Sequence, residues 1–199
     1  MKRDAIGVVI LAAGSSSRLG YAKQLVQFRG KPLIQNTIDL MASFELKVNC
    51  VVVGARANEI LENTDLKTFS AVSNEDWQEG MASSIRAGLN YCLTEYQHLE
   101  HIIVLLADQP FVTSELIEGL IRKPFDLESD ASFCEHNEVV GVPAIFSKKN
   151  FSALKGLTAD QGAKKLLKDK NFKYETVKFD QGFIDVDTAE DVLRLKQLE

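Results

Sequence analysis

One uninterrupted apolar segment constrains the fold more than any other feature of this sequence. Residues 6–13 read IGVVILAA and lead directly into a loop of glycine and serine. A strand without alternating polar residues is typical of a parallel sheet covered on both faces by helices. A second such segment, residues 101–107 (HIIVLLA), ends at Asp108. Together they predict two central parallel strands, and therefore an α/β chain.

The rest of the chain alternates between short strands and helices. Further strands are predicted at residues 49–54, 68–72, 131–135 and 139–146, with the last two partly exposed. Helices are predicted at 32–41, 57–63, 81–92, 113–122, 148–154 and 159–168, and after Thr188 to residue 198. Thr158 with Gln161, and Thr188 with Asp191, have the spacing of helix-capping boxes. This order of elements predicts a predominantly parallel α/β sandwich.

Composition and charge fit one globular domain over residues 1–199. The chain is 45% hydrophobic and 26% charged, which is ordinary for such a domain. A net charge of −5 gives no general attraction for nucleic acid or an anionic membrane, so we expect neither as a partner. Cys50, Cys92 and Cys134 are far apart and form no CxxC pair. They predict reduced, buried thiols and a cytoplasmic location.

Neither a targeting segment nor a membrane span is predicted. Lys2 and Arg3 before an apolar run resemble the start of a signal peptide, but Asp4 interrupts the charge pattern and no small-x-small cleavage site follows. No stretch approaches the roughly 18 apolar residues that a membrane span needs.

The loop after the first strand is the first candidate for chemistry. In open α/β sheets ligands bind beyond the carboxyl ends of the strands. Residues 11–23 read LAAGSSSRLGYAK, and their small side chains let several backbone N–H groups converge on an anion, while Arg18 and Lys23 add positive charge. The glycine spacing is not that of a Walker A loop, and the GxGxxG motif of dinucleotide-linked oxidoreductases is absent. An ordinary polar connection between strand and helix is the alternative interpretation.

Two further carboxylates could hold a metal ion. Asp108 directly follows a buried strand, and Mg²⁺ prefers one or two carboxylates together with phosphates and waters. Asp108 could instead open the turn before Pro110. The second carboxylate is Asp187, with Asp185 as the alternative, because side chains two residues apart share a face of an extended segment. Either could also cap the final helix.

The start of the helix at residue 81 could contact a ligand. Residues 80–86 (GMASSIR) combine the hydroxyls of Ser83 and Ser84 with a helix N-terminus, which suits a ribose, a base edge or a phosphate. N-capping by serine is the alternative. Met81 is assigned to the core face because of its spacing with Ile85. Trp77 precedes this segment and either covers a pocket or simply packs.

Several of these segments resemble one known family. The LAAG sequence with Arg18, Gly20 and Lys23 resembles the signature loop of the MobA-like nucleotidyltransferases. Later segments resemble the molybdenum cofactor cytidylyltransferase branch of this family. They are Asn74 and residues 80–88, 108–110, 141–143, 160–164 and 185–191, so the likeness extends over residues 6–191. One position departs from the family pattern: Ala159 stands where a glycine is usual, so we expect a local difference in that turn.

The resemblance implies a fold and a reaction. The fold would be a single-domain, Rossmann-like, three-layer sandwich of the nucleotide-diphospho-sugar transferase (GT-A-like) type, with a mostly parallel mixed sheet. The reaction would transfer a nucleotidyl group from a nucleoside triphosphate and release pyrophosphate, with Mg²⁺ as the cofactor and Mn²⁺ as the alternative. Arg18, Lys23 and Asp108 would be catalytic, and Asp108 with Asp187 would bind the metal.

The resemblance also implies two sets of binding residues. The nucleotide-binding residues are Leu11, Ala12, Ala13, Gly14, Ser15, Ser16, Lys23, Asn74, Gly80, Ser83, Ser84 and Asp108. The acceptor-binding residues are Gln109, Pro110, Gly141, Pro143, Asp160 and Gly162.

The expected donor follows from one small difference in the first loop and from residues 80–81 and 108–110, which also look like the cytidylyl branch. The branch that transfers guanylate generally reads LAGG where this chain has LAAG, and the extra methyl of Ala13 narrows the space beside a base. We therefore expect CTP as donor and a molybdopterin-type cofactor as acceptor. A cytidylyl- or uridylyltransferase acting on a sugar or alditol phosphate is the close alternative. The distant alternative is a non-catalytic protein that hands the cofactor to a molybdenum hydroxylase apoprotein.

Overall fold

A mixed sheet with a parallel centre organises the chain. The computed structural model describes residues 3–127, 129–182 and 184–199. Its seven-stranded sheet has the order β5-β4-β1-β6-β8-β7-β9. The strands are β1 (Ile6–Ala12), β4 (Val48–Val53), β5 (Ser70–Ser73), β6 (His101–Leu106), β7 (Ala131–His136), β8 (Val139–Ser147) and β9 (Tyr174–Lys178). All neighbours pair in parallel except that β8 runs antiparallel to both β6 and β7, which confirms the expected mostly parallel mixed sheet.

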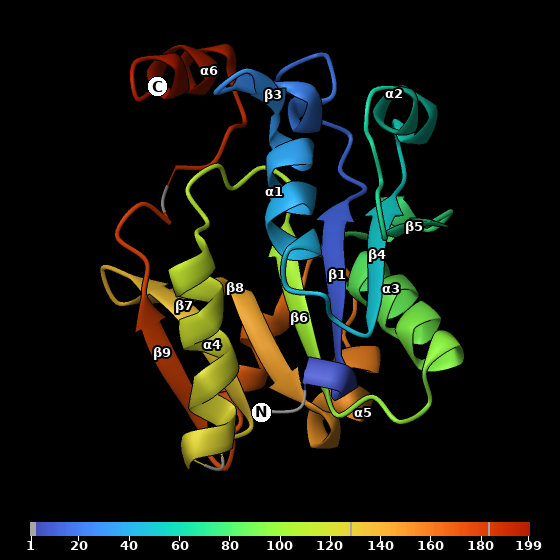
Figure 1. Cartoon of the computed structure of the whole chain (residues 1–199), viewed down its shortest axis with the longest axis vertical. Helices are drawn as coiled ribbons and strands as arrows, with labels where there is room; N and C mark the ends of the chain where they lie inside the picture. The colour runs from blue at the N-terminus through green and yellow to red at the C-terminus, as the bar shows by residue number, and fades with distance from the viewer. Residues whose placement is uncertain (1–2, 128, 183) are drawn as a thin grey trace.

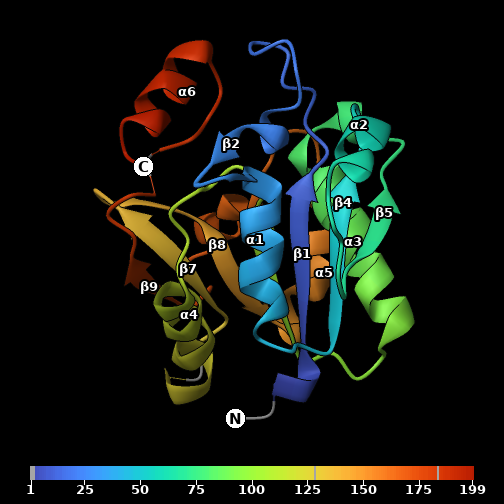
Figure 2. The same cartoon turned by 45° about the horizontal axis from the view of Figure 1, so that its top comes forward.

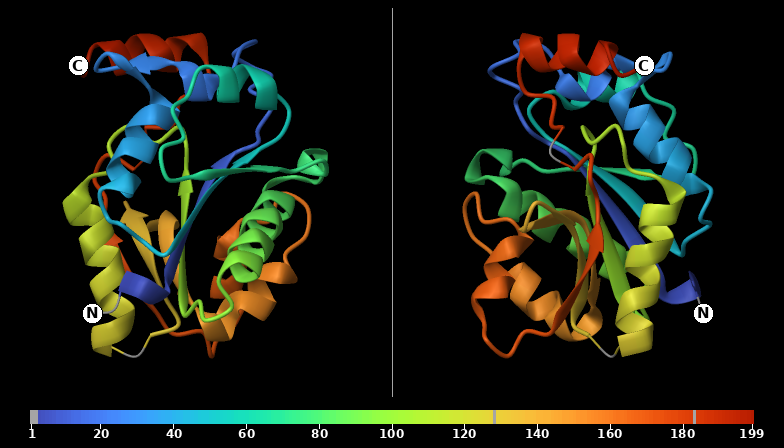
Figure 3. Two further views of the ribbon diagram at one scale, coloured as in Figure 1. Left: turned by 45° about the vertical axis from the view of Figure 1, so that its right-hand side comes forward. Right: turned by 90° about the vertical axis from the view of Figure 1, so that its left-hand side faces the viewer.

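Helices cover both faces of the sheet and complete three layers (Figures 1 and 3). Helices α1 (Leu33–Ala42) and α4 (Ser114–Leu127) pack on one face, and α3 (Met81–Glu95) and α5 (Phe151–Lys155) pack on the other. Along β1 the fully buried side chains alternate between the two cores, with Ile10 in one and Val9 in the other. Burial on both faces explains why this strand carries no polar residue.

The cysteines lie in the core, as predicted. All three are free and buried, and the Sγ atoms of Cys50 and Cys92 are 3.9 Å apart. Burial raises the pKa of the Cys134 thiol to about 12. These thiols therefore fill space between strands and helices.

Two predicted helices differ from the structure. In place of a helix at 159–168, a turn precedes a 3₁₀ helix at Ala163–Lys168, because Ala159 has a left-handed backbone (φ 54°) that a right-handed helix cannot include. The predicted helix at 148–154 is a 3₁₀ turn, Lys148–Asn150, followed by α5. The helix predicted to end at residue 122 continues to Leu127.

The far edge of the sheet was predicted incompletely. Strand β9 was missed, as was the short hairpin of β2 (Gln27–Phe28) and β3 (Lys31–Pro32). Exposure of β7 and β8 is confined to the ends near their shared turn, since residues 131–134 and 143–146 are buried. Strand β9 pairs in parallel with β7 and covers its outer edge.

The parallel strands bring distant loops together at one edge. Leu11 pairs with Leu106, and Ala12 pairs with Val53, so the chain leaves β1, β6 and β4 at the same level. Helices α2 (Ala57–Glu62) and α6 (Ala189–Lys196) lie beyond this edge (Figure 2). Within the described parts of the chain, no helix is long and apolar enough to cross a membrane.

Candidate active site

The ammonium group of Lys23 joins three segments that are distant in the sequence. Its Nζ lies 2.5 Å from Oδ2 of Asp108, after β6, and 2.7 Å from Oδ1 of Asp187, before α6. Arg18 donates from Nη2 to Oδ2 of the same Asp187 at 2.6 Å. The Lys23 and Asp108 side chains are largely buried, whereas the Arg18 side chain is 69% exposed. The predicted catalytic and metal-binding residues therefore form one cluster.

The charges in this cluster stabilise one another. Burial alone would lower the pKa of Lys23, but the carboxylate of Asp108, together with that of Asp187, outweighs burial and raises the pKa. The hydrogen bond from Lys23 is the main reason that the pKa of Asp187 lies below its usual value. Lys23 is thus a cation and Asp187 an anion at neutral pH.

The start of α6 explains why Asp187 is available for this contact. Thr188 is the N-cap, and its Oγ1 accepts a hydrogen bond from the Asp191 N–H. In return Oδ2 of Asp191 accepts hydrogen bonds from the backbone N–H groups of Thr188 and Asp187. This is the predicted capping box. Because Thr188 and Asp191 cap the helix, the carboxylate of Asp187 remains free to bind cations.

Asp185 has a different environment from Asp187. Partial desolvation, followed by the nearby charge of Asp108, raises the pKa of the Asp185 carboxyl group, although the residue is exposed to solvent. Its side chain lines a cavity instead of pairing with Lys23. The ion pairs therefore favour Asp187 over Asp185 as the partner of Asp108.

The donor set suits a hard divalent cation. Asp108 and Asp187 already share one cation, the Lys23 ammonium, so their oxygen atoms converge on a common point. Among the described residues there is no group of three His, Cys, Asp or Glu side chains placed to bind a metal. Two carboxylates fit the preference of Mg²⁺ or Mn²⁺ for sites completed by phosphates and water.

Arg56 holds the loop between β1 and Lys23 in shape. The loop has left-handed residues at Ser16 (φ 53°) and Gly20 (φ 82°). Arg56 donates from Nε to the Ser15 carbonyl at 3.2 Å and from Nη2 to the Gly20 carbonyl at 2.7 Å. Arg56 was not predicted as a functional residue. Its position just after β4, which is a parallel neighbour of β1, could have indicated that Arg56 lies near the loop after β1.

Beside this loop lies a cavity of about 390 Å³, here called the loop cavity. The predicted nucleotide-binding residues that line it are Leu11, Ala13, Gly14, Ser15, Lys23, Gly80, Ser84 and Asp108. Trp77 also lines it and packs so closely against Gly54 that a Cβ atom there would lie 2.7 Å from the Trp77 Cβ.

Four predicted nucleotide-binding residues do not line the loop cavity. The side chain of Ala12 lies in the core on the opposite face of β1. The Ser16 hydroxyl accepts a hydrogen bond from the Lys23 N–H at 3.1 Å. Asn74 donates to the hydroxyls of Ser83 and Ser84 at 2.8 and 3.0 Å, so Asn74 and Ser83 support the wall from behind.

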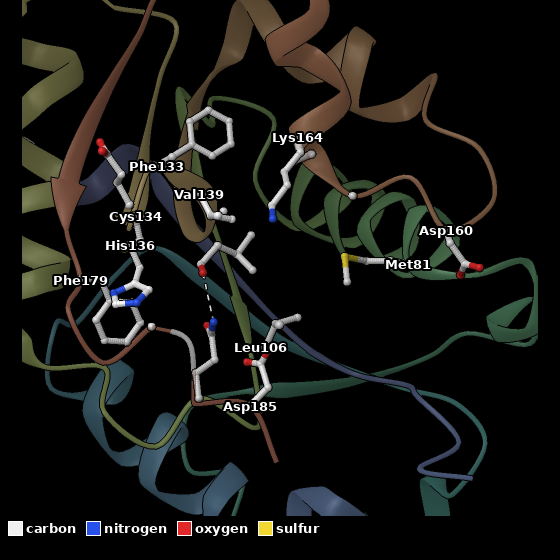
Figure 4. Close-up of a pocket in the computed structure, with 17 residues that line it drawn as sticks. Met81, Leu106, Phe133, Cys134, His136, Val139, Asp160, Lys164, Phe179 and Asp185 are labelled. Carbon is white, nitrogen blue, oxygen red and sulfur yellow. Dashed lines mark hydrogen bonds between the residues drawn. The ribbon is translucent and has the colours of Figure 1, made fainter. Parts of the chain in front are cut away.

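A second cavity of about 490 Å³, here called the strand cavity, opens between the end of β6, the strands β7 and β8, and the chain after β9 (Figure 4). The predicted acceptor-binding residues that line it are Gln109, Gly141, Asp160 and Gly162; Pro110 and Pro143 do not. Lys164 reaches into it from the side opposite Phe179 and His136. Lys164 belongs to the segment 160–164 that resembles the family, but it was not predicted as a site residue.

The two cavities adjoin. Met81, Leu106 and Asp160 line both of them. Met81 was assigned to the core face, but its side chain is only partly buried there. Gly80 has a left-handed backbone (φ 99°), and a Cβ atom at this position would lie 2.2 Å from Oδ1 of Asp160. Only glycine therefore permits this close approach of α3 to the turn that contains Asp160.

The turn at Ala159 retains a conformation that favours glycine. Its positive φ of 54° is uncommon for a residue with a side chain. The Ala159 carbonyl accepts a hydrogen bond from the Ala82 N–H at 3.2 Å, which ties the turn to the start of α3. Ala159 therefore adopts the left-handed conformation that a glycine would adopt without strain.

The pH dependence of stability tests the Lys23–Asp187 pair. A carboxylate whose pKa is lowered by folding stabilises the folded state above its unfolded pKa, near 3.8, and this contribution disappears as the pH falls through the lower, folded value. We expect Asp187→Asn to lower the free energy of unfolding by about 1 kcal/mol at pH 7. The difference from the wild type should shrink below pH 4. Urea titrations at several pH values measure it, with the exposed Asp180→Asn as control, and a difference independent of pH would contradict the pairing.

Comparison with known proteins agrees with this geometry. Residues 8–177 match the model of the MobA-like NTP transferase domain. The nicotine blue oxidoreductase of Paenarthrobacter nicotinovorans is 30% identical over 94% of both chains. The molybdenum cofactor cytidylyltransferase of Escherichia coli K12 is 26% identical over 98% of this chain and 97% of that protein.

Solved structures show the same likeness. A Mycobacterium sp. strain JC1 homologue of the Mycobacterium tuberculosis protein Rv0371c superposes with a TM-score of 0.84 at 28% identity, over 98% of both chains. Rv0371c in complex with manganese superposes with a TM-score of 0.77 at 26% identity, over 96% of this chain and 98% of that one. The chain therefore belongs to the MobA-like NTP transferase family and is a nucleotidyltransferase of that family.

Proposed function

We propose that residues 1–199 form one nucleotidyltransferase domain that transfers CMP from CTP to the phosphate of a molybdopterin-type cofactor and releases pyrophosphate. One observation carries the proposal: Lys23 lies between Asp108 and Asp187 beside the loop cavity, and a second cavity adjoins the first. This arrangement can hold a triphosphate and a second substrate side by side. The likeness to the cytidylyltransferase of Escherichia coli supports the choice of substrates.

The chemistry requires little from the protein beyond positioning and positive charge. An oxygen of the acceptor phosphate attacks the α-phosphorus of CTP, and the bond from that phosphorus to the bridging oxygen breaks, so that pyrophosphate leaves with the electron pair. The attacking phosphate is already an anion and needs no strong general base. Arg18 and Lys23 would stabilise the charge on the departing pyrophosphate, and the backbone N–H groups of residues 13–16 would orient the triphosphate.

Asp108 and Asp187 would hold the divalent cation, Mg²⁺ by preference and Mn²⁺ as the alternative. The bound cation supplies Lewis-acid polarisation of the α-phosphate. The manganese complex of Rv0371c supports a divalent ion in a related protein. Lys23 pairs with both carboxylates, which keeps their oxygen atoms together.

The choice of CTP rests on the narrow end of the loop cavity. Ala13 lines this cavity, and a Cβ atom on Gly54 would lie 2.9 Å from the Ala13 Cβ, so the methyl has no room to move aside. Gly80 and Ser84 would contact the nucleoside from the start of α3. A pyrimidine needs less space here than a purine.

Turnover with each of the four nucleoside triphosphates tests the substrates. Pyrophosphate release should be fastest with CTP and should require molybdopterin. Preference for GTP would overturn the Ala13 argument. Turnover with sugar or alditol phosphates would favour the close alternative, and binding to a molybdenum hydroxylase apoprotein without any turnover would favour a hand-over protein.

Asp108→Asn tests the role of the buried carboxylate. Removing the charge should slow pyrophosphate release about 100-fold because the metal ion would lose one of its two carboxylate ligands. Quenching of the single tryptophan, Trp77, measures whether CTP still binds in the loop cavity. Asp180→Asn, at an exposed position, is the control. Normal turnover in Asp108→Asn would show that this residue does not hold the metal.

A further inference from the structure

The side chain of Arg86 supports the wall that the two cavities share. Met81 and Asp160 line both the loop cavity and the strand cavity, so the start of α3 and the turn at residues 158–161 form this wall (Figure 4). Arg86 lies further along α3 and lines neither cavity. It borders a separate hollow instead, and therefore contacts the wall from outside.

One guanidinium group joins the two parts of the wall. Arg86 donates from Nη1 to the Leu157 carbonyl at 2.7 Å and from Nη2 to Oε2 of Glu79 at 2.6 Å. Leu157 directly precedes the turn, and Glu79 directly precedes Gly80 at the start of α3. The Arg86 side chain is 27% exposed, so these charge-assisted hydrogen bonds are partly shielded from water. Arg86 therefore ties the turn to the start of the helix.

The turn has little burial of its own. Leu157 and Ala163 at its two ends are buried, but residues 158–161 between them are not. A second hydrogen bond attaches the turn to α3, because the Ala82 N–H donates to the Ala159 carbonyl at 3.2 Å. This N–H belongs to the first turn of a helix and has no acceptor within that helix. Its exchange with solvent therefore reports whether the turn is attached.

Backbone strain at Ala159 opposes this attachment. Its φ of 54° lies in the left-handed region, which is unfavourable for alanine and readily adopted by glycine. Such strain persists only where the surrounding structure holds the backbone in place. Arg86 holds the carbonyl that lies two residues before the strained position.

We infer that Arg86 is a positioning residue, which holds the strained turn at Ala159 against α3 and thereby keeps Gly80 and Asp160 in place around the two substrates. This inference rests on the proposed function for what the cavities bind, and it adds a residue that shapes both cavities without lining either. Loss of Arg86 should release the turn and weaken nucleotide binding, because Gly80 and Asp160 line the loop cavity.

Arg86→Met tests this role without turnover, because methionine keeps the apolar stem and removes both hydrogen bonds. Hydrogen exchange of the Ala82 amide, measured by NMR on the full chain, should become about tenfold faster, the effect of one lost hydrogen bond. The dissociation constant for CTP with Mg²⁺, measured by calorimetry, should rise about fivefold. Lys148→Met is the matched control, because Lys148 pairs with Glu100 at 3.0 Å at the opposite end of β6. It should change neither value.

Ala159→Gly distinguishes positioning of the turn from simple support of the helix. Added to Arg86→Met, it should slow exchange of the Ala82 amide about fivefold and return the dissociation constant for CTP to within about twofold of the wild type, because glycine adopts this φ without strain. If Arg86 only stabilised α3, a change outside that helix would restore neither value. Glu79→Gln weakens the hold on the Arg86 side chain more mildly, and should speed the same exchange about threefold even if Arg86→Met fails to fold.

The outcomes separate this inference from the proposed function. Unchanged exchange at Ala82 in Arg86→Met or Glu79→Gln, or no restoration by Ala159→Gly, overturns the role of Arg86. Pyrophosphate release from CTP with molybdopterin is measured in parallel on the wild type. Its absence would contradict the proposed function alone, since the exchange measurements need no substrate. Normal release together with unchanged exchange would contradict the inference alone.

Discussion

The contact of one buried ammonium with two carboxylates organises the functional edge of this protein. Asp108, Asp185 and Asp187 are neighbouring acids, and such a group is unfavourable without a cation. Lys23 provides it, and in doing so fastens the loop after β1 to the loop after β6 and to the segment before α6. In the proposed reaction the same carboxylates would hold the divalent ion that accompanies the phosphates. The fold and the proposed reaction would thus use the same electrostatic arrangement.

The sheet topology explains why two cavities adjoin there. Strands β1, β4, β5 and β6 are parallel and end at one level, and the segments that follow β1, β5 and β6 line the loop cavity. Strand β8 then runs in the opposite direction beside β6. Its early residues, including Val142, therefore reach the same edge and meet Gln109. The reversal of a single strand adds the strand cavity to the nucleotide side of an otherwise parallel sheet.

The local sequence pattern predicted those strands whose residues are buried along their whole length. The apolar runs that became β1, β4 and β6 need no tertiary information, because burial on both faces leaves few polar residues in them; Asn49 and His101 are the exceptions. Strand β9 mixes charged and apolar residues over only five positions, Tyr174–Lys178, and forms because β7 offers it an edge. The helix predicted from Ala159 failed because one backbone angle depends on the contact of that turn with α3.

The site was predictable in part for the same reason. Asp108 follows a recognisable strand, so its place at the sheet edge could be derived from sequence. Which of Asp185 and Asp187 pairs with Lys23 could not be derived, because it depends on how the chain before α6 lies in space. The role of Arg56 as a support for the loop likewise depends on carbonyl groups more than 30 residues away. The types of residue in the sequence indicate which groups could be charged or bind cations, but only the folded structure shows which of these groups contact one another.

Anomalous diffraction from crystals grown with Mn²⁺ and a non-hydrolysable CTP analogue tests the central claim most directly. The claim is that Asp108 and Asp187 together hold the cation that the nucleotide requires. It predicts a manganese peak at about 2.1 Å from oxygen atoms of both carboxylates, with the Lys23 ammonium moved onto the phosphates. A peak bound by other residues, or a nucleotide in the loop cavity with Lys23 still between the two carboxylates, would contradict it.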